Sequence, residues 1–332
     1  MSTANFHSNH IKSTFPSRNR HQMKLQIFNF ILLAAGTPVE TLITCNVPDG
    51  KPSSIPQDCQ VCLDTIVVTN DKSTWPAKEL ALKEIKTLSI QADLPPSLQI
   101  PLRVETLELT GLISYESEFL YIQAKNIYID QLYEVEITFN NIKPSVLKIS
   151  SSEVKINGIA SEHLARLDIR FSTVKNTRLH DLRSAGAINI YYSTISPQQL
   201  LNNLLKAHSI NVRYSKINHL KLYVENVTGS IFIEDNKNVE SIEFPFLEYV
   251  HGDLFVDNDS DMSLINLPRL HHIHAIEIHD KTTDINIYSQ VIWKGESFFE
   301  DTTSLGDYSA LKERGLKFGL GLRYSTRCYV GL

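Results

Sequence analysis

The chain has 332 residues, of which 42% are hydrophobic and 21% are charged, and its formal net charge at pH 7 is −5. The high apolar and aromatic content excludes a chain that is disordered throughout. The acidic balance, with no basic patch, argues against nucleic acid as a partner.

The N-terminal segment has the layout of a secretory signal peptide. A polar stretch, residues 1–22, precedes Met23-Lys24 and an apolar run from Leu25 to Ala35, which ends in small residues up to Gly36. We therefore predict that residues 1–36 are a disordered leader plus signal peptide and that the protein is secreted, hence extracellular. The apolar run is too short for a stable membrane span. Two alternatives stay open: Met23 as the true start, and an N-terminal membrane anchor.

Three of the four cysteines follow closely, as Cys45, Cys59 and Cys62, and Cys328 lies near the end. In an oxidising compartment this spacing indicates a disulfide, so we expect Cys45 to pair with Cys59 or Cys62 in an N-terminal cap of residues 37–81. We expect Cys328 to be unpaired or intermolecular. Cys59 and Cys62 also have the spacing of a redox pair or half a zinc site, but the surrounding pattern for either is absent. We predict no cofactor and no metal.

From residue 82 onward one short phrase, apolar–variable–apolar, recurs ten times at intervals of 19 to 23 residues. Its copies begin at Leu88, Leu107, Ile127, Leu147, Leu167, Ile188, Ile210, Ile231, Leu254 and Ile276. A fixed period of this size is the signature of a solenoid.

The phrase itself indicates a β-strand, because alternation puts the two apolar side chains on one face. About 17 residues separate one phrase from the next, which is too few for a long helix and a return. We therefore predict an all-β fold: a parallel β-solenoid, a right-handed coil of about ten repeats similar to leucine-rich repeats. The solenoid is expected over residues 82–281, capped at both ends, with residues 282–332 forming a C-terminal cap or a poorly ordered tail.

Two further columns follow the repeat. Five residues after successive strand starts stand Ser152, Ser172, Ser193, Ser215, Asn236 and Asp259, predicted to turn inward and to satisfy buried backbone groups. Gly186, Gly229 and Gly252 each lie two residues before a strand start, where we expect a backbone conformation that only glycine adopts easily.

A longer pattern lies near the end of the repeats. Phe244-Pro245-Phe246-Leu247, the Gly252-to-Val256 strand and Leu267-Pro268-Arg269-Leu270 follow one another. Over roughly residues 227–280 this resembles the receptor L-domain, the repeat domain of insulin and epidermal growth factor receptors, with relatives in nematode secreted proteins and fungal cell-wall proteins. The resemblance implies a leucine-rich-repeat-like solenoid that binds a ligand.

Two N-glycosylation sequons occur in the repeats, at Asn226-Val-Thr228 and Asn258-Asp-Ser260, both in predicted turns. The alternating Asp257, Asp259 and Asp261 do not complete a calcium loop, so we interpret them as a polar turn. A group of histidines, namely His271, His272, His274 and His279, has no carboxylate at fixed spacing and is not interpreted as a metal site.

One group of residues is the candidate binding surface. At the ends of three consecutive strands stand Arg170 and Phe171, Tyr191 and Tyr192, and Arg213 and Tyr214. They are predicted to point away from the core on stacked coils. Exposed aromatic and arginine side chains are typical of binding hot spots. A self-stacking array that only stabilises the sheet is the other interpretation, and both remain open.

These patterns favour a secreted, non-enzymatic recognition protein that binds an extracellular protein or glycan through the exposed strand face. An alternative is a parallel β-helix polysaccharide lyase or hydrolase. Its paired carboxylates are not found, because the strand-middle acids Glu108, Asp168 and Glu277 are single and scattered. A structural matrix component or a receptor-derived decoy is a third possibility.

Overall fold

The computed structural model describes residues 42–69, 82–91, 102–111, 116–119, 122–175, 177, 179–258, 262–279, 282–287, 292–293, 298–300 and 317–319. Its contacts divide the chain into Met1–Leu42 and Ile43–Leu332. The fold below is that of the second unit. The predicted leader and signal peptide and Cys328 lie outside the described residues. In the described part of the chain no helix has the length and apolarity needed to cross a membrane.

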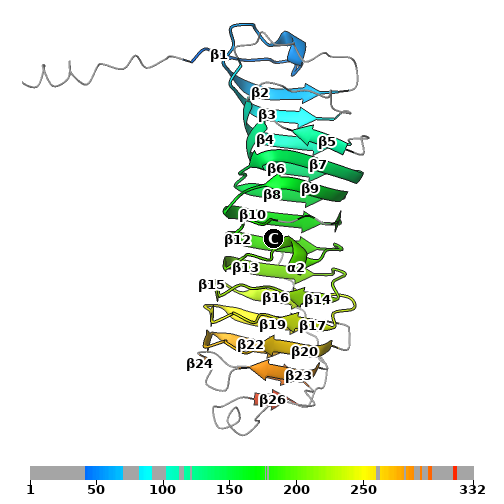
Figure 1. Ribbon diagram of the computed structural model, residues 1–332, viewed down its shortest axis with the longest axis vertical. Helices are drawn as coiled ribbons and strands as arrows, with labels where there is room; N and C mark the ends of the chain where they lie inside the picture. Colours follow the sequence, from blue (N-terminus) through cyan, green and yellow to red (C-terminus); the bar gives the residue numbers. More distant parts are fainter. Residues whose placement is uncertain are drawn as a thin grey trace, which may run out of the picture. The chain divides into compact units, whose positions relative to one another are not determined.

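The second unit is dominated by one sheet of 18 strands in which every neighbouring pair is parallel. Its main strands are β2 (Val61–Val68), β3 (Glu84–Ile90), β4 (Leu102–Thr110), β6 (Ile122–Asp130), β8 (Val146–Ser150), β10 (His163–Arg170), β12 (Ser184–Tyr191), β13 (Lys206–Arg213), β16 (Ile231–Glu234), β19 (Asp253–Asp257), β22 (Ala275–Ile278), β25 (Phe298–Glu300) and β26 (Lys317–Gly319). Two-residue strands accompany them: β1 (Thr44–Cys45), β15 (Asn226–Val227), β18 (Tyr249–Val250), β21 (His272–Ile273) and β24 (Ile292–Trp293). Figure 1 shows these strands following one another in chain order.

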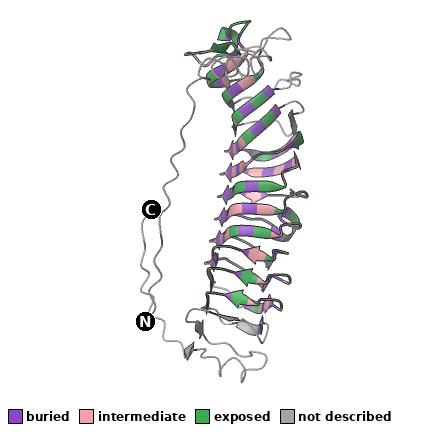
Figure 2. Cartoon of the chain, turned by 90° about the vertical axis from the view of Figure 1, so that its left-hand side faces the viewer, coloured by how far each residue is buried: buried purple, intermediate pink, exposed green. Residues whose placement is uncertain are grey.

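The register of this sheet confirms the predicted repeat. Each phrase start pairs with the next, from Leu88 opposite Leu107 to Leu254 opposite Ile276. The protein is thus a parallel β-solenoid of about ten turns, as predicted. Buried and exposed residues alternate along its strands (Figure 2), because successive side chains point to opposite faces.

The return half of each coil is also extended. One four-stranded parallel sheet comprises β5 (Glu116–Phe119), β7 (Tyr133–Ile142), β9 (Glu153–Ile159) and β11 (Thr173–Val174). Another comprises β14 (His219–Lys221), β17 (Ser241–Glu243), β20 (Met262–Leu267) and β23 (Thr282–Ile287). Between the two sheets, single bridges join Thr173, Thr194, Lys216 and Lys237 in turn. The helical pieces among the described residues are single turns, η1 (Pro52–Ser54) and α2 (Pro197–Leu200).

The core lies inside the coils and is almost wholly apolar. The first and third residues of the phrases are at most 1% exposed, as with Leu88, Ile127 and Ile188. Burying one such side chain stabilises the fold by about 1.5–3 kcal/mol relative to leaving it exposed. One coil alone cannot enclose these side chains, so the stacking of neighbours supplies the burial.

The stack extends beyond both predicted boundaries. Ile66, in the segment predicted to be a cap, pairs with Leu88 and is fully buried, so the solenoid begins one coil before residue 82. After residue 281, β23 pairs with β20 and β25 pairs with β22. The main-chain ladder therefore continues past residue 281, where the apolar phrase no longer repeats at its earlier spacing.

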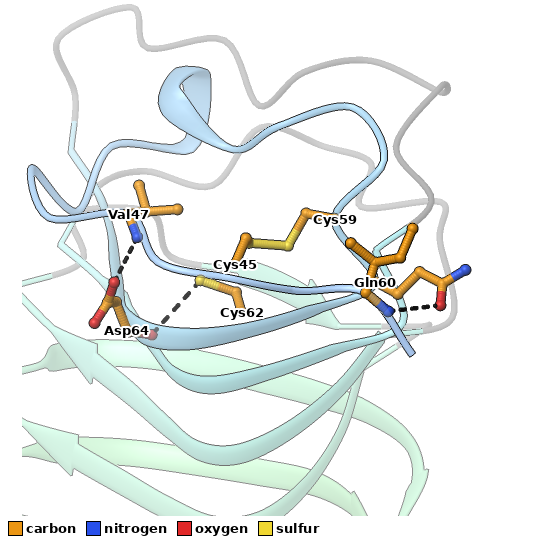
Figure 3. Close-up of a disulfide and its surroundings, with 7 residues drawn as sticks. Cys45, Val47, Cys59, Gln60, Cys62 and Asp64 are labelled. Atoms are coloured by element: carbon orange, nitrogen blue, oxygen red, sulfur yellow. Dashed lines mark hydrogen bonds between the residues drawn. A yellow bond between two sulfur atoms is a disulfide. The ribbon is translucent and has the colours of Figure 1, made fainter. Parts of the chain in front are cut away.

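The N-terminal edge of the stack carries a disulfide. Cys45 and Cys59 are bonded, with their Cα atoms 5.7 Å apart, which confirms one of the two predicted pairings (Figure 3). Cys62 stands opposite Cys45 in the β1–β2 pairing, is fully buried and is a free thiol. Burial raises the pKa of the Cys62 thiol. The bridged loop covers the open edge of β2.

The predicted polar column is present inside the coils. The backbone N–H of Ser152 donates to Ser172 Oγ, that of Ser172 to Ser193 Oγ, and that of Ser193 to Ser215 Oγ, each at 3.2 Å. Within the described residues the column continues to Asn236 and Asn258, and Asn258 Oδ1 accepts from the Asn236 N–H at 3.1 Å. The member predicted for this coil was Asp259, which lies outside the described residues. Asn258, one residue earlier, is the side chain that bonds to Asn236 in the column.

The expectation for the three glycines was wrong in its reason. Gly186, Gly229 and Gly252 do not have positive φ angles. Glycine is present at these positions because the backbone of the neighbouring coil is close. A Cβ on Gly186 would lie 2.2 Å from the carbonyl oxygen of Ala165, and a Cβ on Gly229 would lie 2.7 Å from the carbonyl oxygen of His208. Close approach of two backbones, rather than backbone freedom, selects glycine here.

Candidate functional site

The candidate site lies at the corner where each coil leaves the large sheet. The chain turns there through one residue with positive φ in seven consecutive coils: Gly111 (63°), Gln131 (54°), Ser151 (48°), Phe171 (51°), Tyr192 (50°), Tyr214 (54°) and Asp235 (51°). Glycine adopts this conformation at no steric cost, whereas a bulky side chain at positive φ is uncommon and strained. Three adjacent coils nevertheless carry an aromatic residue at this position.

These three rings, Phe171, Tyr192 and Tyr214, form the aromatic ladder. The Phe171 and Tyr192 ring centroids are 4.9 Å apart with planes 8° apart, and those of Tyr192 and Tyr214 are 4.7 Å and 7° apart. Relative exposure falls from 61% for Phe171 through 51% for Tyr192 to 38% for Tyr214. Each stacked pair contributes about 0.5–1.5 kcal/mol, which offsets part of the backbone strain. The rings cover one another's faces, so the ladder presents mainly ring edges to a ligand.

The remaining predicted surface residues lie one position earlier, at the ends of the strands. Arg170 is exposed, and its guanidinium carbon lies 5.3 Å from the centroid of the Tyr191 ring. Arg213 is half-buried, lies 5.2 Å from the Phe232 ring and pairs with Glu234 at 3.0 Å. The structure thus brings all six predicted residues into two adjacent columns across three coils, with Tyr191 and Arg213 less exposed than the ladder.

A polar network holds the strand face next to these columns. Asp168 is only 4% exposed and accepts hydrogen bonds from Asn189 at 2.6 Å and, as an ion pair, from Arg166 at 2.8 Å. Asn211 continues the network to Asn189 at 2.8 Å. The carboxylate is therefore occupied by partners within the chain. The burial of Asp168 was not predictable from the sequence, because the middle residue of each phrase is expected to point away from the core.

On the other side of the ladder lies a shallow hollow of about 370 Å³, here called the lysine hollow. It is lined by Tyr192, Ser193, Thr194, Tyr214, Ser215, Lys216, Lys237 and Asn238. Two of these residues are lysines and none is acidic. Lys216 and Lys237 are exposed, and within the described residues neither ammonium group makes an ion pair.

Another lysine two coils away behaves differently. Lys175 pairs with Glu153, and that hydrogen bond raises the pKa of the Lys175 ammonium. Lys216 and Lys237, by contrast, have no such carboxylate partner among the described residues, so their charge is available to a ligand. The sequence interpretation missed them, although a column six residues after each strand start, including Thr194, Lys216 and Lys237, is visible in the repeat.

The sequons lie in different surroundings from those expected. Asn226 is in β15 rather than a turn; it is half-buried, and its Oδ1 is buried without a hydrogen-bond partner in the described part. Asn258 is 5% exposed, and its side chain is part of the Ser/Asn column, accepting from the backbone and side-chain N–H groups of Asn236. Burial and these hydrogen bonds argue against a glycan on Asn258 in the folded chain.

The predicted polar turn is largely outside the described residues, and two of the clustered histidines make local contacts. Asp259 and Asp261 lie outside the described residues. His274 lies 2.6 Å from Asp253, and His272 stacks on Tyr249 with centroids 5.2 Å apart. Among the residues that the structure describes, no group of three or more His, Cys, Asp or Glu side chains is arranged to hold a metal ion.

Comparison with known proteins adds no family to this geometry. No protein-family model matches the chain, and no curated protein and no solved structure matches it significantly.

Proposed function

We propose that the protein is a secreted, non-enzymatic recognition protein that binds an extracellular protein or glycan at the aromatic ladder and its flanking residues. The observation that carries the proposal is the set of three bulky aromatic residues at corner positions that glycine would occupy at lower cost, all at least 38% exposed. Strained backbone at exposed, chemically distinctive residues is typical of functional sites.

Secretion is supported by two independent features. The apolar run from Leu25 to Ala35 follows a basic residue and precedes small residues. A disulfide such as Cys45–Cys59 is typical of proteins in an oxidising compartment. The resemblance to the receptor L-domain, which rests on the motifs of two coils, supports the same class of function.

The polysaccharide lyase alternative has less support from the strand face. Such a reaction needs an acid or base that can reach substrate. Asp168, the strand-middle acid nearest the candidate surface, is buried, and its oxygens are engaged by Arg166 and Asn189. Incubation with acidic polysaccharides followed by assay for new reducing ends tests this alternative directly.

The proposal is tested by replacing two stacked tyrosines of the ladder with alanine and comparing the result with the loss of another stacked pair elsewhere in the solenoid. The full chain is expressed in eukaryotic cells and screened against immobilised glycans and extracellular proteins, beside Tyr192→Ala/Tyr214→Ala. The matched control is Tyr249→Ala/His272→Ala, because Tyr249 is also 38% exposed and is stacked on His272 at another part of the coil.

We expect the ladder variant to lose binding by at least about tenfold, as hot-spot aromatic residues do. The control variant is expected to bind as the unchanged protein does. Equal binding by all three proteins, each shown to be folded, would remove the ladder from the function.

A further inference from the structure

Charge and shape around the aromatic ladder identify the class of ligand within the proposed function. Three features combine: the ladder's exposed edges, the lysine hollow beside it, and the arginines on its strand side. The lining of the lysine hollow carries two cations and no acid on a protein whose net charge is −5, so the hollow is a local departure from the overall balance. A site of this kind attracts anions by complementarity.

The cations differ in how far they are already neutralised. Arg213 is paired with Glu234 at 3.0 Å, while Arg170 approaches Asp168 only at 3.9 Å and that carboxylate is engaged by Arg166. Lys216 and Lys237 make no ion pair within the described residues. The ladder therefore has available positive charge on both sides, and most of it is in the lysine hollow.

The arrangement repeats along the stack of coils. Lys216 and Lys237 are bridge partners on adjacent coils, as are Thr194 and Lys216. Parallel strands stack at about 4.8 Å, so donors recur at that interval. A ligand that extends along the stack and carries regularly spaced anionic and hydroxyl groups would meet a matching donor on each coil.

The chemistry of the hollow favours a sugar chain over an acidic peptide. Its lining combines hydroxyl groups, an amide and two ammonium groups around the edges of two tyrosine rings. Peptide and protein ligands are usually anchored by an apolar side chain in a desolvated pocket, whereas this hollow is shallow and open to solvent. Sugars instead offer hydroxyl groups to such donors, and their C–H groups pack against the exposed edges of aromatic rings.

We propose that the ladder and the lysine hollow bind an anionic polysaccharide, one that carries sulfate or carboxylate groups, with an anionic group held between Lys216 and Lys237. This inference rests on the proposed function and specifies its ligand. Phe171, Tyr192 and Tyr214 line the path of the chain, and Thr194 and Asn238 donate to its hydroxyl groups.

The test uses the full chain with three immobilised polysaccharides: heparin, which is sulfated; polygalacturonate, which is carboxylated; and dextran, which is neutral. Poly-glutamate serves as the acidic peptide. The variant is Lys216→Gln/Lys237→Gln. Its matched control is Lys86→Gln/Lys125→Gln, which removes the same charge from two exposed lysines beside another hollow, one that also contains Glu84 and Glu105.

We expect binding to heparin or polygalacturonate and none to dextran, and the preferred probe identifies sulfate or carboxylate as the anionic group. The Kd of the Lys216/Lys237 variant should rise at least about tenfold, as expected when charge-assisted hydrogen bonds are lost. The control should stay within about twofold, since isolated surface charges contribute little.

Equal weakening by both lysine pairs, preference for poly-glutamate, or no binding to either anionic polysaccharide would overturn the inference. The two proposals fail separately. If a neutral glycan or a protein binds in a manner that needs Tyr192 and Tyr214 but not the lysines, the proposed function stands and only the anionic ligand is rejected. If neither the tyrosines nor the lysines affect any binding, both are rejected.

Discussion

Ser193 shows how a single hydroxyl group links three coils. Its Oγ accepts the backbone N–H of Ser172 at 3.2 Å and donates to the Tyr191 carbonyl at 2.7 Å, while its own N–H donates to Ser215. Ser193 is 3% exposed, so no water can replace its hydroxyl without a rearrangement. A buried N–H left without an acceptor costs about 1–3 kcal/mol.

Ser193→Ala should therefore lower the free energy of unfolding by about 1–3 kcal/mol, measured by denaturant titration. Thr194→Ala, at the next and exposed residue, is the control and should change it by less than about 0.5 kcal/mol. Coincident unfolding curves for the two variants would show that the column does not support the fold.

Gly186 tests whether close approach, rather than backbone freedom, selects glycine. Gly186→Ala places a Cβ 2.2 Å from a backbone oxygen of the neighbouring strand, whereas Gly111→Ala meets nothing within 4 Å but has φ at 63°. The strain of left-handed backbone costs about 1–2 kcal/mol per residue. We expect Gly186→Ala to destabilise the protein more than Gly111→Ala does, measured as the shift in unfolding midpoint. The opposite order would contradict the inference that close approach of the neighbouring backbone selects glycine at position 186.

At the scale of one element, the corner turn explains why the aromatic residues are exposed. Positive φ at the corner directs the next residue inward, to the Ser/Asn column, and leaves the corner side chain outside. The same geometry recurs in coils that carry Gly111, Gln131 or Ser151, so the turn does not require an aromatic ring. The rings are thus a property of three coils and not of the fold.

The next prediction concerns the disulfide in the N-terminal cap. The Cys45–Cys59 bridge spans 14 residues at an edge that would otherwise be open. Removing it by Cys59→Ser should lower stability by about 3 kcal/mol, the chain-entropy estimate for a loop of this size. Unfolding of this variant and of the unchanged protein, each with and without reductant, measures the effect. Reductant should affect only the unchanged protein.

Cys62 supplies the control for this element. It is fully buried, and burial raises its thiol pKa, so iodoacetamide should label it in the unfolded protein and not in the folded one. Peptide mapping that finds Cys62 in a bridge with Cys45 or Cys59 would contradict the observed pairing.

The repeat made the architecture predictable from the sequence. Ten phrase starts, identified by their apolar alternation alone, are in register in one parallel sheet, because a one-residue slip would turn the apolar pair outward. The Ser/Asn column was predictable for the same reason. Its last member was shifted by one residue, because Asn258 and Asp259 are both polar and the pattern alone does not choose between them.

The site was only partly predictable. The aromatic and arginine positions follow from the register, but their stacking geometry, the burial of Asp168 and the lysine hollow depend on side-chain contacts between coils. The true length of the solenoid was also missed. Ile66-Val67-Val68 has the phrase and the spacing, yet the nearby cysteines favoured a cap.

At the scale of the whole molecule, export is the first consequence of the account. Expression of the full chain in eukaryotic cells should place the protein in the medium with a mobility shift after N-glycosidase treatment. Asn226→Gln should abolish that shift. Asn258→Gln should leave it unchanged but destabilise the fold, because the Asn258 side chain is part of the buried column. An unshifted band retained in the cytosol would contradict secretion.

The central claim is that the aromatic ladder is the contact surface. Footprinting of the unaltered protein tests this claim most directly, because the experiment introduces no substitution that could disturb the fold. Tyrosines are nitrated in the free protein and in its complex with the tightest-binding glycan or protein from the screen, and are then quantified by mass spectrometry. The account predicts that Tyr192 and Tyr214 become protected in the complex while Tyr249 reacts as before. Unchanged nitration of Tyr192 and Tyr214 in a saturated complex would contradict it.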